Sequence, residues 1–414
     1  MKIFFSVGEP SGDLHGSNLI RALRSRQPDI ECIGFGGPKM VAAGARLHED
    51  LTRQAIMGIW RIASAIPTLL LLLLRADRIF RHERPDAVVL IDFPGFNWWI
   101  AWRAKQRRIP VIYYGTPQLW AWAPWRTKKM RRLTDHVLCK LPFEQDWFRQ
   151  RGVHATYVGH PYFDQLASQS LDQQFLNHQR DHTRPLVVIL PGSRTQEIKL
   201  NLAWFLKATE HIRAKIPTAR FVVASYNKKQ SVLADEICRQ QGISMEIFHG
   251  RTQELMELAD CCMACSGSVS LELLYRTKPT VIYYRISRFT CYLLKLFLTV
   301  RYITLVNILN DPQALEPARQ PFGSASPNAD QLLMPEYPTH LDKSKPMAQH
   351  VIRWLTDKDE YRQLTERMNR LKDRICAPGA SQRSADYILA ALGEGRRSRP
   401  AASGAVSDEL DKAA

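Results

Sequence analysis

The sequence predicts an α/β protein of two Rossmann-like, doubly wound domains that face each other across a cleft. Short apolar, β-branched runs alternate with segments of helical period, and this alternation occurs twice along the 414 residues. Near-continuous apolar runs are typical of strands buried on both faces, and helical spacers between them give parallel β-α-β units. A polar stretch over 168–184 separates the two series and marks the domain boundary.

The expected strands follow these runs in order. In the first series they lie at 2–8, 30–37, 86–92, 109–115, 136–140 and 155–160. In the second series they lie at 185–192, 220–226, 245–250, 261–267 and 280–285. The domains therefore extend over 1–167 and 185–345, with a loop over 311–345. Helices over 346–392 should pack across the domains, and the polar tail over 393–414 should be disordered.

The cysteines favour a reducing compartment and a core role. Cys261, Cys262 and Cys265 form the one cluster that suggests a metal site, but no histidine or second cysteine pair lies at zinc spacing. We interpret them as residues of a buried strand and expect no metal. The N-terminus reads as a first strand rather than a signal peptide. The longest apolar run, 66–74, has about half the length that a membrane-spanning helix needs.

The charge indicates an anionic partner, because the formal net charge is +17. Nine basic and no acidic residues lie within 103–132, and six tryptophans lie within 98–125. This mixture suits a membrane interface, where tryptophan lies at headgroup depth and basic residues meet anionic lipid. It also suits nucleic acid, whose bases stack on indoles, or a solvated basic face beside core tryptophans. Composition alone leaves all three open.

Polar residues follow two strands of the first domain, where ligands of open α/β sheets bind. The first strand ends in GEPSGDLHG (8–16), in which glycines allow a tight turn and Ser11 or Asp13 can cap the next helix. Its glycine spacing is not that of a dinucleotide fingerprint. The third strand ends in IDFPGFN, where the Asp92 carboxylate should project into the cleft as a general base. A capped glycine turn and a loop-capping aspartate are the alternatives.

Two further motifs follow strands of the second domain. LPGSRTQE (190–197) offers donors at Gly192 and Ser193 and a permanent charge at Arg194 that suits a phosphate. CSGSVSLE (265–272) opens a helix that carries Glu272 one turn further in. Such an arrangement fits a nucleoside diphosphate, with the pyrophosphate on the backbone amides and the ribose hydroxyls on Glu272.

These motifs, with PxxWAW (117–122), LPF (141–143) and VGHP (158–161), occur in the order and at the spacing of lipid-A-disaccharide synthases. The chain resembles this family from about residue 3 to residue 310. The resemblance implies a GT-B fold and a metal-independent, cofactor-free, inverting transfer. In that reaction 2,3-diacylglucosamine passes from UDP to the 6-hydroxyl of 2,3-diacylglucosamine 1-phosphate (lipid X), which gives the β-1,6-linked lipid A disaccharide 1-phosphate and UDP.

The resemblance also implies roles for individual residues. Asp92 becomes the general base, and Glu9 is expected to be a second catalytic residue on the acceptor side, which Ser11 and Asn97 also line. The UDP side is expected to comprise Gly192, Ser193, Arg194, Glu197, Ser266, Gly267, Ser268 and Glu272. Asn307 stands where the family has a Pro-Asn pair, preceded here by valine, and 311–331 reads as an insertion.

A substrate that carries acyl chains would explain why the segment 56–80 is so apolar. Contacts with membrane or acyl chains are expected at helical spacing from Ile66, Leu69, Leu70, Leu73 and Leu74, with a plain core helix as the alternative. The expected partners are UDP-diacylglucosamine, lipid X and an anionic membrane surface, but no nucleic acid, and a homodimer is left open. The expected location is cytoplasmic, peripheral on the inner face of the cytoplasmic membrane.

Two other functions remain as alternatives. The first is another UDP-sugar enzyme of GT-B fold, either an N-acetylglucosaminyl transferase or a UDP-N-acetylglucosamine 2-epimerase. The second is a nucleic-acid-binding protein on a decayed catalytic fold.

Overall fold

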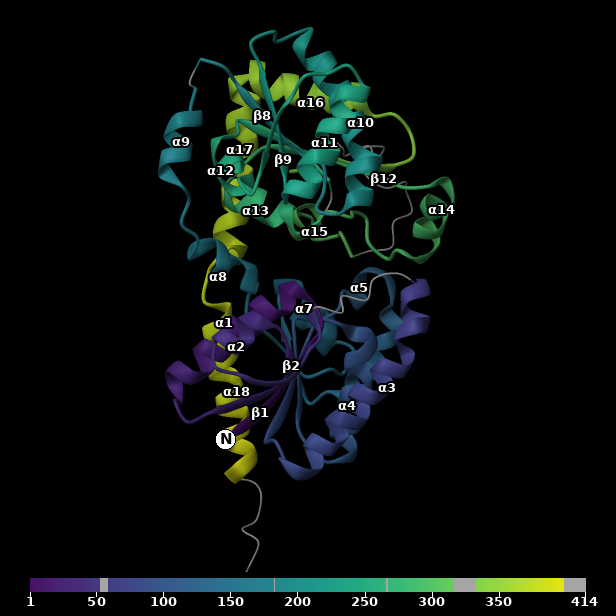
Figure 1. The fold of residues 1–414 in the computed structure, drawn as a ribbon, viewed down its shortest axis with the longest axis vertical. Helices are drawn as coiled ribbons and strands as arrows, with labels where there is room; N and C mark the ends of the chain where they lie inside the picture. Colours follow the sequence, from purple (N-terminus) through teal and green to yellow (C-terminus); the bar gives the residue numbers. More distant parts are fainter. Residues whose placement is uncertain (53–58, 182, 266, 316–331, 398–414) are drawn as a thin grey trace, which may run out of the picture.

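Two α/β domains stack along the long axis of the molecule (Figure 1). The computed structural model describes residues 1–52, 59–181, 183–265, 267–315 and 332–397. The first domain holds a seven-stranded sheet of order β3-β2-β1-β4-β5-β6-β7, and the second a six-stranded sheet of order β10-β9-β8-β11-β12-β13. Every strand pair is parallel. The fold class expected from the sequence is confirmed.

The strands of the first sheet are β1 (Lys2–Val7), β2 (Glu31–Gly36), β3 (Arg46–Asp50), β4 (Ala87–Ile91), β5 (Val111–Tyr114), β6 (His136–Cys139) and β7 (Ala155–Tyr157). Those of the second are β8 (Leu186–Leu190), β9 (Arg220–Ser225), β10 (Glu246–His249), β11 (Cys261–Ala264), β12 (Thr280–Arg285) and β13 (Glu336–Thr339). All expected strands are present. The expected loop over 311–345 was wrong in one part, because it contains β13.

Helices cover both faces of the first sheet. One face packs against α1 (Pro10–Arg26), α2 (Pro38–Ala42) and α18 (Ala380–Arg397), and the other against α3 (Ile59–His82), α4 (Pro94–Gln106), α6 (Thr127–Leu133) and α7 (Pro142–Arg149). The short α5 (Leu119–Trp122) and a 3₁₀ turn (Pro124–Arg126) precede α6. Alternate side chains of β1 enter opposite cores, because Phe4 packs on the α3 side and Phe5 on the α1 side. Within the described ranges, no helix combines the length and apolarity that a bilayer crossing requires.

The second domain is built in the same way. Its helices are α10 (Thr195–Arg213), α11 (Lys228–Gln240), α12 (Thr252–Leu258), α13 (Val269–Tyr275), α14 (Arg288–Phe297), α15 (Leu305–Asn310), α16 (Ser344–Thr356) and α17 (Lys358–Ile375). Asn307 is buried, and its amide donates to the Met334 carbonyl (2.7 Å) and to Glu336 (3.0 Å). It thereby ties α15 to the start of the edge strand β13.

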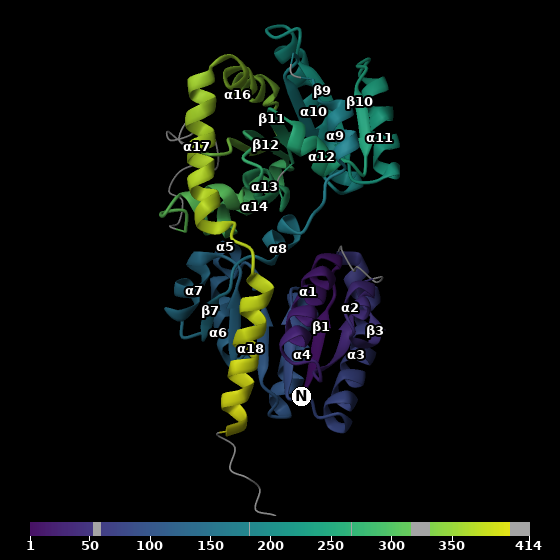
Figure 2. The same cartoon turned by 90° about the vertical axis from the view of Figure 1, so that its left-hand side faces the viewer.

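The chain crosses between the domains twice, and the two crossings are bonded together. The outward crossing runs through α8 (Pro161–Ala167) and α9 (Gln173–Gln179), and the return crossing leads from α17 into α18 (Figure 2). Asp164 of α8 accepts hydrogen bonds from the amides of Gly379, Ala380 and Ser381 and from the Ser381 hydroxyl. The expected disordered tail over 393–414 was wrong for 393–397, which form the last turn of α18, and the remainder of that tail lies outside the described residues.

A second junction lies after α14. The Thr299 amide donates to the Ala121 carbonyl (2.9 Å), and the Thr299 hydroxyl donates to the Trp120 carbonyl (2.5 Å). Val300 and Tyr302 are buried in the same core as α3, α4 and α5 of the first domain. The second domain therefore touches the first on this side as well.

Candidate functional site

Asp92 follows β4 in an uncommon backbone conformation. Asp92 (φ 47°) and Phe93 (φ 44°) are both left-handed, which non-glycine residues seldom adopt. The Asp92 carbonyl accepts hydrogen bonds from the Asn97 side-chain amide (2.8 Å) and from the Tyr113 hydroxyl (2.8 Å). The Ser6 hydroxyl in turn donates to Asn97 (2.6 Å). Strain of this kind persists only where the surroundings hold it, and it is concentrated at functional sites.

Asn97 was expected on the acceptor side, but the structure places its side chain elsewhere. The residue is fully buried, and its amide group is occupied by Ser6 and by the backbone around Asp92. It therefore supports the Asp92 loop from beneath. Gly8 contributes to the same packing, because a Cβ there would come within 2.4 Å of the Phe93 ring.

Three charged groups meet at the carboxyl ends of β1, β4 and β6. The Lys140 ammonium lies 3.2 Å from an Asp92 carboxylate oxygen, and both side chains are largely buried. Burial lowers the pKa of Lys140, but the carboxylates of Asp92, Glu144 and Glu9 outweigh it, and the pKa is raised. Burial and the Asp92 charge raise the pKa of Glu9, while Lys140 and Arg194 of the second domain oppose that rise. This cluster thus lies between the domains.

Lys140 and Glu144 were not among the site residues predicted from the sequence. The buried Glu144 carboxylate accepts from the backbone amides of Lys140 and Leu141 (3.0 Å each), from Trp120 Nε1 (2.9 Å) and from the Thr116 hydroxyl (3.1 Å). It joins the segments of the PxxWAW and LPF motifs and fixes the backbone that carries Lys140. A glutamate three residues after Leu141 is the spacing of a helix capping box, and it was the available signal.

The first glycine motif differs in detail from expectation. Ser11 is exposed in the first turn of α1, beside Glu9. Asp13 does not cap α1. Its buried carboxylate instead accepts from the backbone amides of Gly37, Lys39 and Met40 and so holds the start of α2.

In the second domain, 192–197 forms a tight turn into α10. Gly192 has φ 121°, and a Cβ there would lie 2.5 Å from that of Glu197. The Glu197 carboxylate accepts from the amides of Ser193 (2.9 Å) and Arg194 (3.0 Å), so it caps the helix. The Arg194 guanidinium is exposed and lines a cavity of about 730 Å³ together with Tyr284, Arg285 and His340.

The motif at 265–272 is only partly described, since Ser266 lies outside the described residues. Gly267 (φ 155°) and Ser268 are exposed at the start of α13. Glu272 is buried behind them and accepts from the Tyr162 hydroxyl (2.6 Å) and from Arg276 (3.1 Å). Tyr162 of α8 thus brings the interdomain link against the carboxylate that was expected to bind ribose.

The apolar stripe of α3 is divided between core and surface. Leu73 is buried and Leu69 packs partly against the core, whereas Leu70 and Leu74 are more than half exposed. Leu71, not among the expected contacts, is 67% exposed. The side chain of Ile66 lies outside the described residues. The outward stripe therefore consists of Leu70, Leu71 and Leu74.

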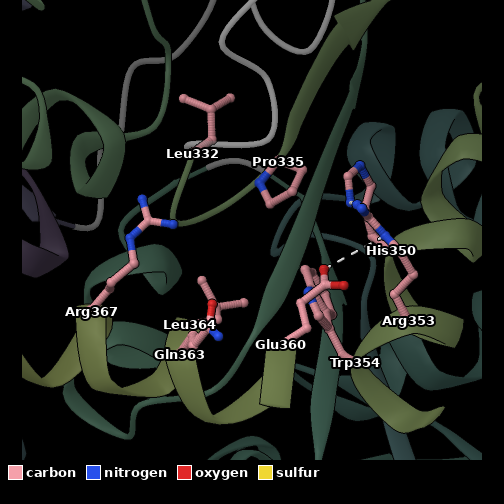
Figure 3. A pocket seen from close by; sticks show the side chains of 9 residues that line it. All are labelled: Leu332, Pro335, His350, Arg353, Trp354, Glu360, Gln363, Leu364 and Arg367. Atoms are coloured by element: carbon pink, nitrogen blue, oxygen red, sulfur yellow. Dashed lines mark hydrogen bonds and ion pairs between the residues drawn. The ribbon is translucent and has the colours of Figure 1, made fainter. Parts of the chain in front are cut away.

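A separate cavity of about 230 Å³ lies between α16, α17 and the segment before β13 (Figure 3). Arg353 and Glu360 form an ion pair at its edge (3.6 Å). None of the expected site residues in the described part of the chain lines it, so we exclude it from the candidate site.

Known structures share this two-domain architecture. The S. aureus MnaA–UDP co-structure superposes with a TM-score of 0.62 at 13% identity, covering 95% of this chain and 97% of that one. Acinetobacter baumannii MurG does so with a TM-score of 0.53 at 11% identity, covering 94% and 99%. At such identities the likeness shows the fold alone. The class of the protein is the GT-B fold of glycosyltransferases and related epimerases.

Sequence comparison specifies the family within this class. Residues 3–360 match the family model described as lipid-A-disaccharide synthetase. The lipid-A-disaccharide synthase of Myxococcus xanthus is 30% identical over 406 residues, covering 95% of this chain and 98% of that protein. That of Alkalilimnicola ehrlichii is 34% identical over 316 residues, covering 75% and 82%. The chain belongs to the lipid-A-disaccharide synthase family, which confirms the resemblance seen in its motifs.

Proposed function

We propose that this chain transfers 2,3-diacylglucosamine from UDP-2,3-diacylglucosamine to the 6-hydroxyl of lipid X. The products are the β-1,6-linked lipid A disaccharide 1-phosphate and UDP. The observation that carries the proposal is family membership over residues 3–360, combined with the Glu9–Asp92–Lys140 cluster, on which the charge of Arg194 from the second domain acts. Family membership does not favour the alternatives.

In the proposed reaction, Asp92 removes the proton from the acceptor hydroxyl while that oxygen attacks the anomeric carbon. The new C–O bond forms as the bond to the UDP oxygen breaks, and the electron pair leaves on the β-phosphate. Attack opposite to the leaving group inverts the anomeric centre. Lys140 holds the Asp92 carboxylate in place, and Arg194 stabilises the charge that develops on the phosphate.

The proposed nucleotide site lies in the second domain. Arg194 and the exposed Gly267 and Ser268 would contact the diphosphate, and Glu272 would bind the ribose after exchanging its bond with Tyr162. A structural relative solved with UDP supports a nucleotide in this fold. The reaction proposed requires no cofactor, as the resemblance implies.

We further propose that the protein acts as a peripheral enzyme on the inner face of the cytoplasmic membrane. Both substrates carry acyl chains and reside in a bilayer. The exposed leucines of α3 provide apolar surface for docking, and the positive charge of the chain provides attraction to anionic lipid.

Mass spectrometry of the product tests the reaction directly. Wild-type protein given UDP-2,3-diacylglucosamine and lipid X in detergent should form the disaccharide monophosphate and release one UDP per product. Omission of lipid X should abolish both. A 2-epimer formed from UDP-N-acetylglucosamine, with no disaccharide, would instead support an epimerase and overturn the proposal.

A further inference from the structure

The outer face of the first domain carries a cavity that the proposed reaction does not use. It lies between α4 and α6 and has a volume of about 450 Å³, and α3 also packs on α4. Tryptophans and cations make up most of its lining: Trp98, Trp99, Trp102, Lys128, Lys129 and Arg132. Trp98 is buried and forms an inner wall, whereas Trp99 is 56% exposed at the mouth.

The positive charge in this cavity is not neutralised by the protein. No carboxylate lines it, and in the described part of the chain no ion pair joins Lys128, Lys129 or Arg132 to an acid. The Lys129 ammonium lies 5.4 Å from the centre of the Trp98 ring. Burial, and then the nearby Arg126, lowers the pKa of Lys129, as expected for a cation held among like charges without a counterion.

We infer that this cavity binds the phosphate of an anionic lipid headgroup. Three cations attract a phosphate electrostatically, and indole rings at the mouth suit the depth of the headgroups. The neighbouring helix α3 presents Leu70, Leu71 and Leu74 to solvent, so apolar surface and phosphate site lie on adjacent helices. Binding of a soluble anion would require the cations of the cavity but would not explain the exposed leucines of α3. The inference rests on the proposed membrane docking and adds to it a defined headgroup site.

Vesicle flotation with the full chain tests the site. Wild-type protein should float with phosphatidylcholine vesicles that contain phosphatidylglycerol, and weakly with phosphatidylcholine alone. The variant Lys128→Gln/Lys129→Gln/Arg132→Gln should bind the anionic vesicles about 100-fold more weakly, since each cation near a membrane contributes about fivefold. The matched control Lys215→Gln/Lys228→Gln/Lys229→Gln removes three exposed charges from the second domain and should change binding less than about threefold.

Further measurements separate the outcomes. Lys128→Arg/Lys129→Arg keeps the charge and should bind like wild type. If the triple variant does not fold, Lys128→Gln/Arg132→Gln replaces it, because this double variant keeps the contact of Lys129 with the Trp98 ring. Wild-type vesicle binding by the folded variant would overturn the inference. So would a site filled equally well by inorganic phosphate, or tighter binding of a single-stranded oligonucleotide with steep salt dependence.

Activity in detergent distinguishes this inference from the proposed function. The triple variant should form disaccharide at the wild-type rate from detergent-dispersed substrates while its vesicle binding falls. A wild-type protein that makes no disaccharide but shows the expected flotation pattern would defeat the proposed reaction and leave the headgroup site standing.

Discussion

Among single residues, Asp92 is the one whose surroundings specify its position most fully. Two consecutive left-handed residues place it at the end of β4, hydrogen bonds from Asn97 and Tyr113 hold its carbonyl, and Lys140 holds its carboxylate. The backbone and the side chain of Asp92 are thus both fixed. A base fixed in this way needs little reorganisation when a hydroxyl approaches.

Asp92→Asn tests the proposed base. Asparagine keeps the size and the hydrogen-bonding capacity but cannot accept the proton, so turnover should fall by roughly 10²–10⁴. UDP affinity by calorimetry should stay unchanged. Near-normal turnover of this variant would show that Asp92 is not the base and only caps its loop.

Lys140→Met should shift the pH dependence of turnover. The Lys140 ammonium is one of the charges that oppose the raised pKa of Glu9. Its loss should therefore raise the pKa of Glu9 further and move the acid limb of the kcat profile to higher pH. Lys140→Arg, which keeps the charge, should restore the limb. If Lys140→Met lowers kcat equally at every pH, the residue is structural only.

Arg194→Ala tests the nucleotide side. A charge-assisted bond to phosphate is worth about 1.5–3 kcal/mol, so the Kd for UDP should rise roughly 10- to 150-fold. Lys199→Ala removes an exposed charge from the same helix and should leave the Kd within about twofold. Equal affinities for the two variants would place the nucleotide elsewhere.

Among the elements, α3 combines two functions along one helix. Leu72 and Leu73 pack into the core, and Leu70, Leu71 and Leu74 face outward. The helical period of 3.6 residues separates these two sets, even though six leucines run consecutively.

Leu70→Ser/Leu71→Ser/Leu74→Ser should move the protein from vesicles to the soluble fraction and leave thermal unfolding nearly unchanged. The outward side chains lose no core packing, but each can contribute on the order of 1 kcal/mol or more to insertion. The control Leu73→Ser should destabilise the fold by about 2–5 kcal/mol. An unfolded triple variant, or one that still floats with vesicles, would show that these leucines do not mediate docking.

Both strands that could not be predicted from the sequence, β3 and β13, lie at sheet edges, although the edge strands β7 and β10 were predicted. Interior strands such as β1 and β8 require apolar runs, which are visible in the sequence. The edge strands β3 and β13 have one open side, so polar residues in β3 and Pro338 in β13 are tolerated and hide the signal. At the candidate site, Asp92 and Arg194 were predicted because ligands of open α/β sheets bind beyond the carboxyl ends of the strands. The hydrogen bonds of Glu197 and Glu272 could not be predicted in the same way. Glu197 accepts from backbone amides, and Glu272 accepts from Tyr162, which lies 110 positions away in the sequence, so no local pattern reveals that contact.

Across the molecule, Asp164 connects the two chain crossings. Asp164→Ala leaves three backbone amides and a hydroxyl without this acceptor, so α18 should detach more readily from the first domain. The expected results are a lower midpoint of thermal unfolding and faster proteolysis between residues 376 and 380. Asp386→Ala removes only an exposed ion pair with Arg26 and should change neither. Unaltered proteolysis in Asp164→Ala would show that the crossings are held by other contacts.

The two interdomain junctions lie at opposite edges of the molecule and differ in kind. Four hydrogen bonds to Asp164 and the packing of α18 join the bound edge, whereas two hydrogen bonds from Thr299 and the burial of Val300 and Tyr302 join the opposite edge, on the side of α3 and α14 (Figure 1). A rotation of the domains about the bound edge therefore parts them most where Thr299 meets Trp120. That edge lies on the side of α3, whose exposed leucines are proposed to dock on the bilayer, so an opening there would admit an acylated sugar from the membrane side.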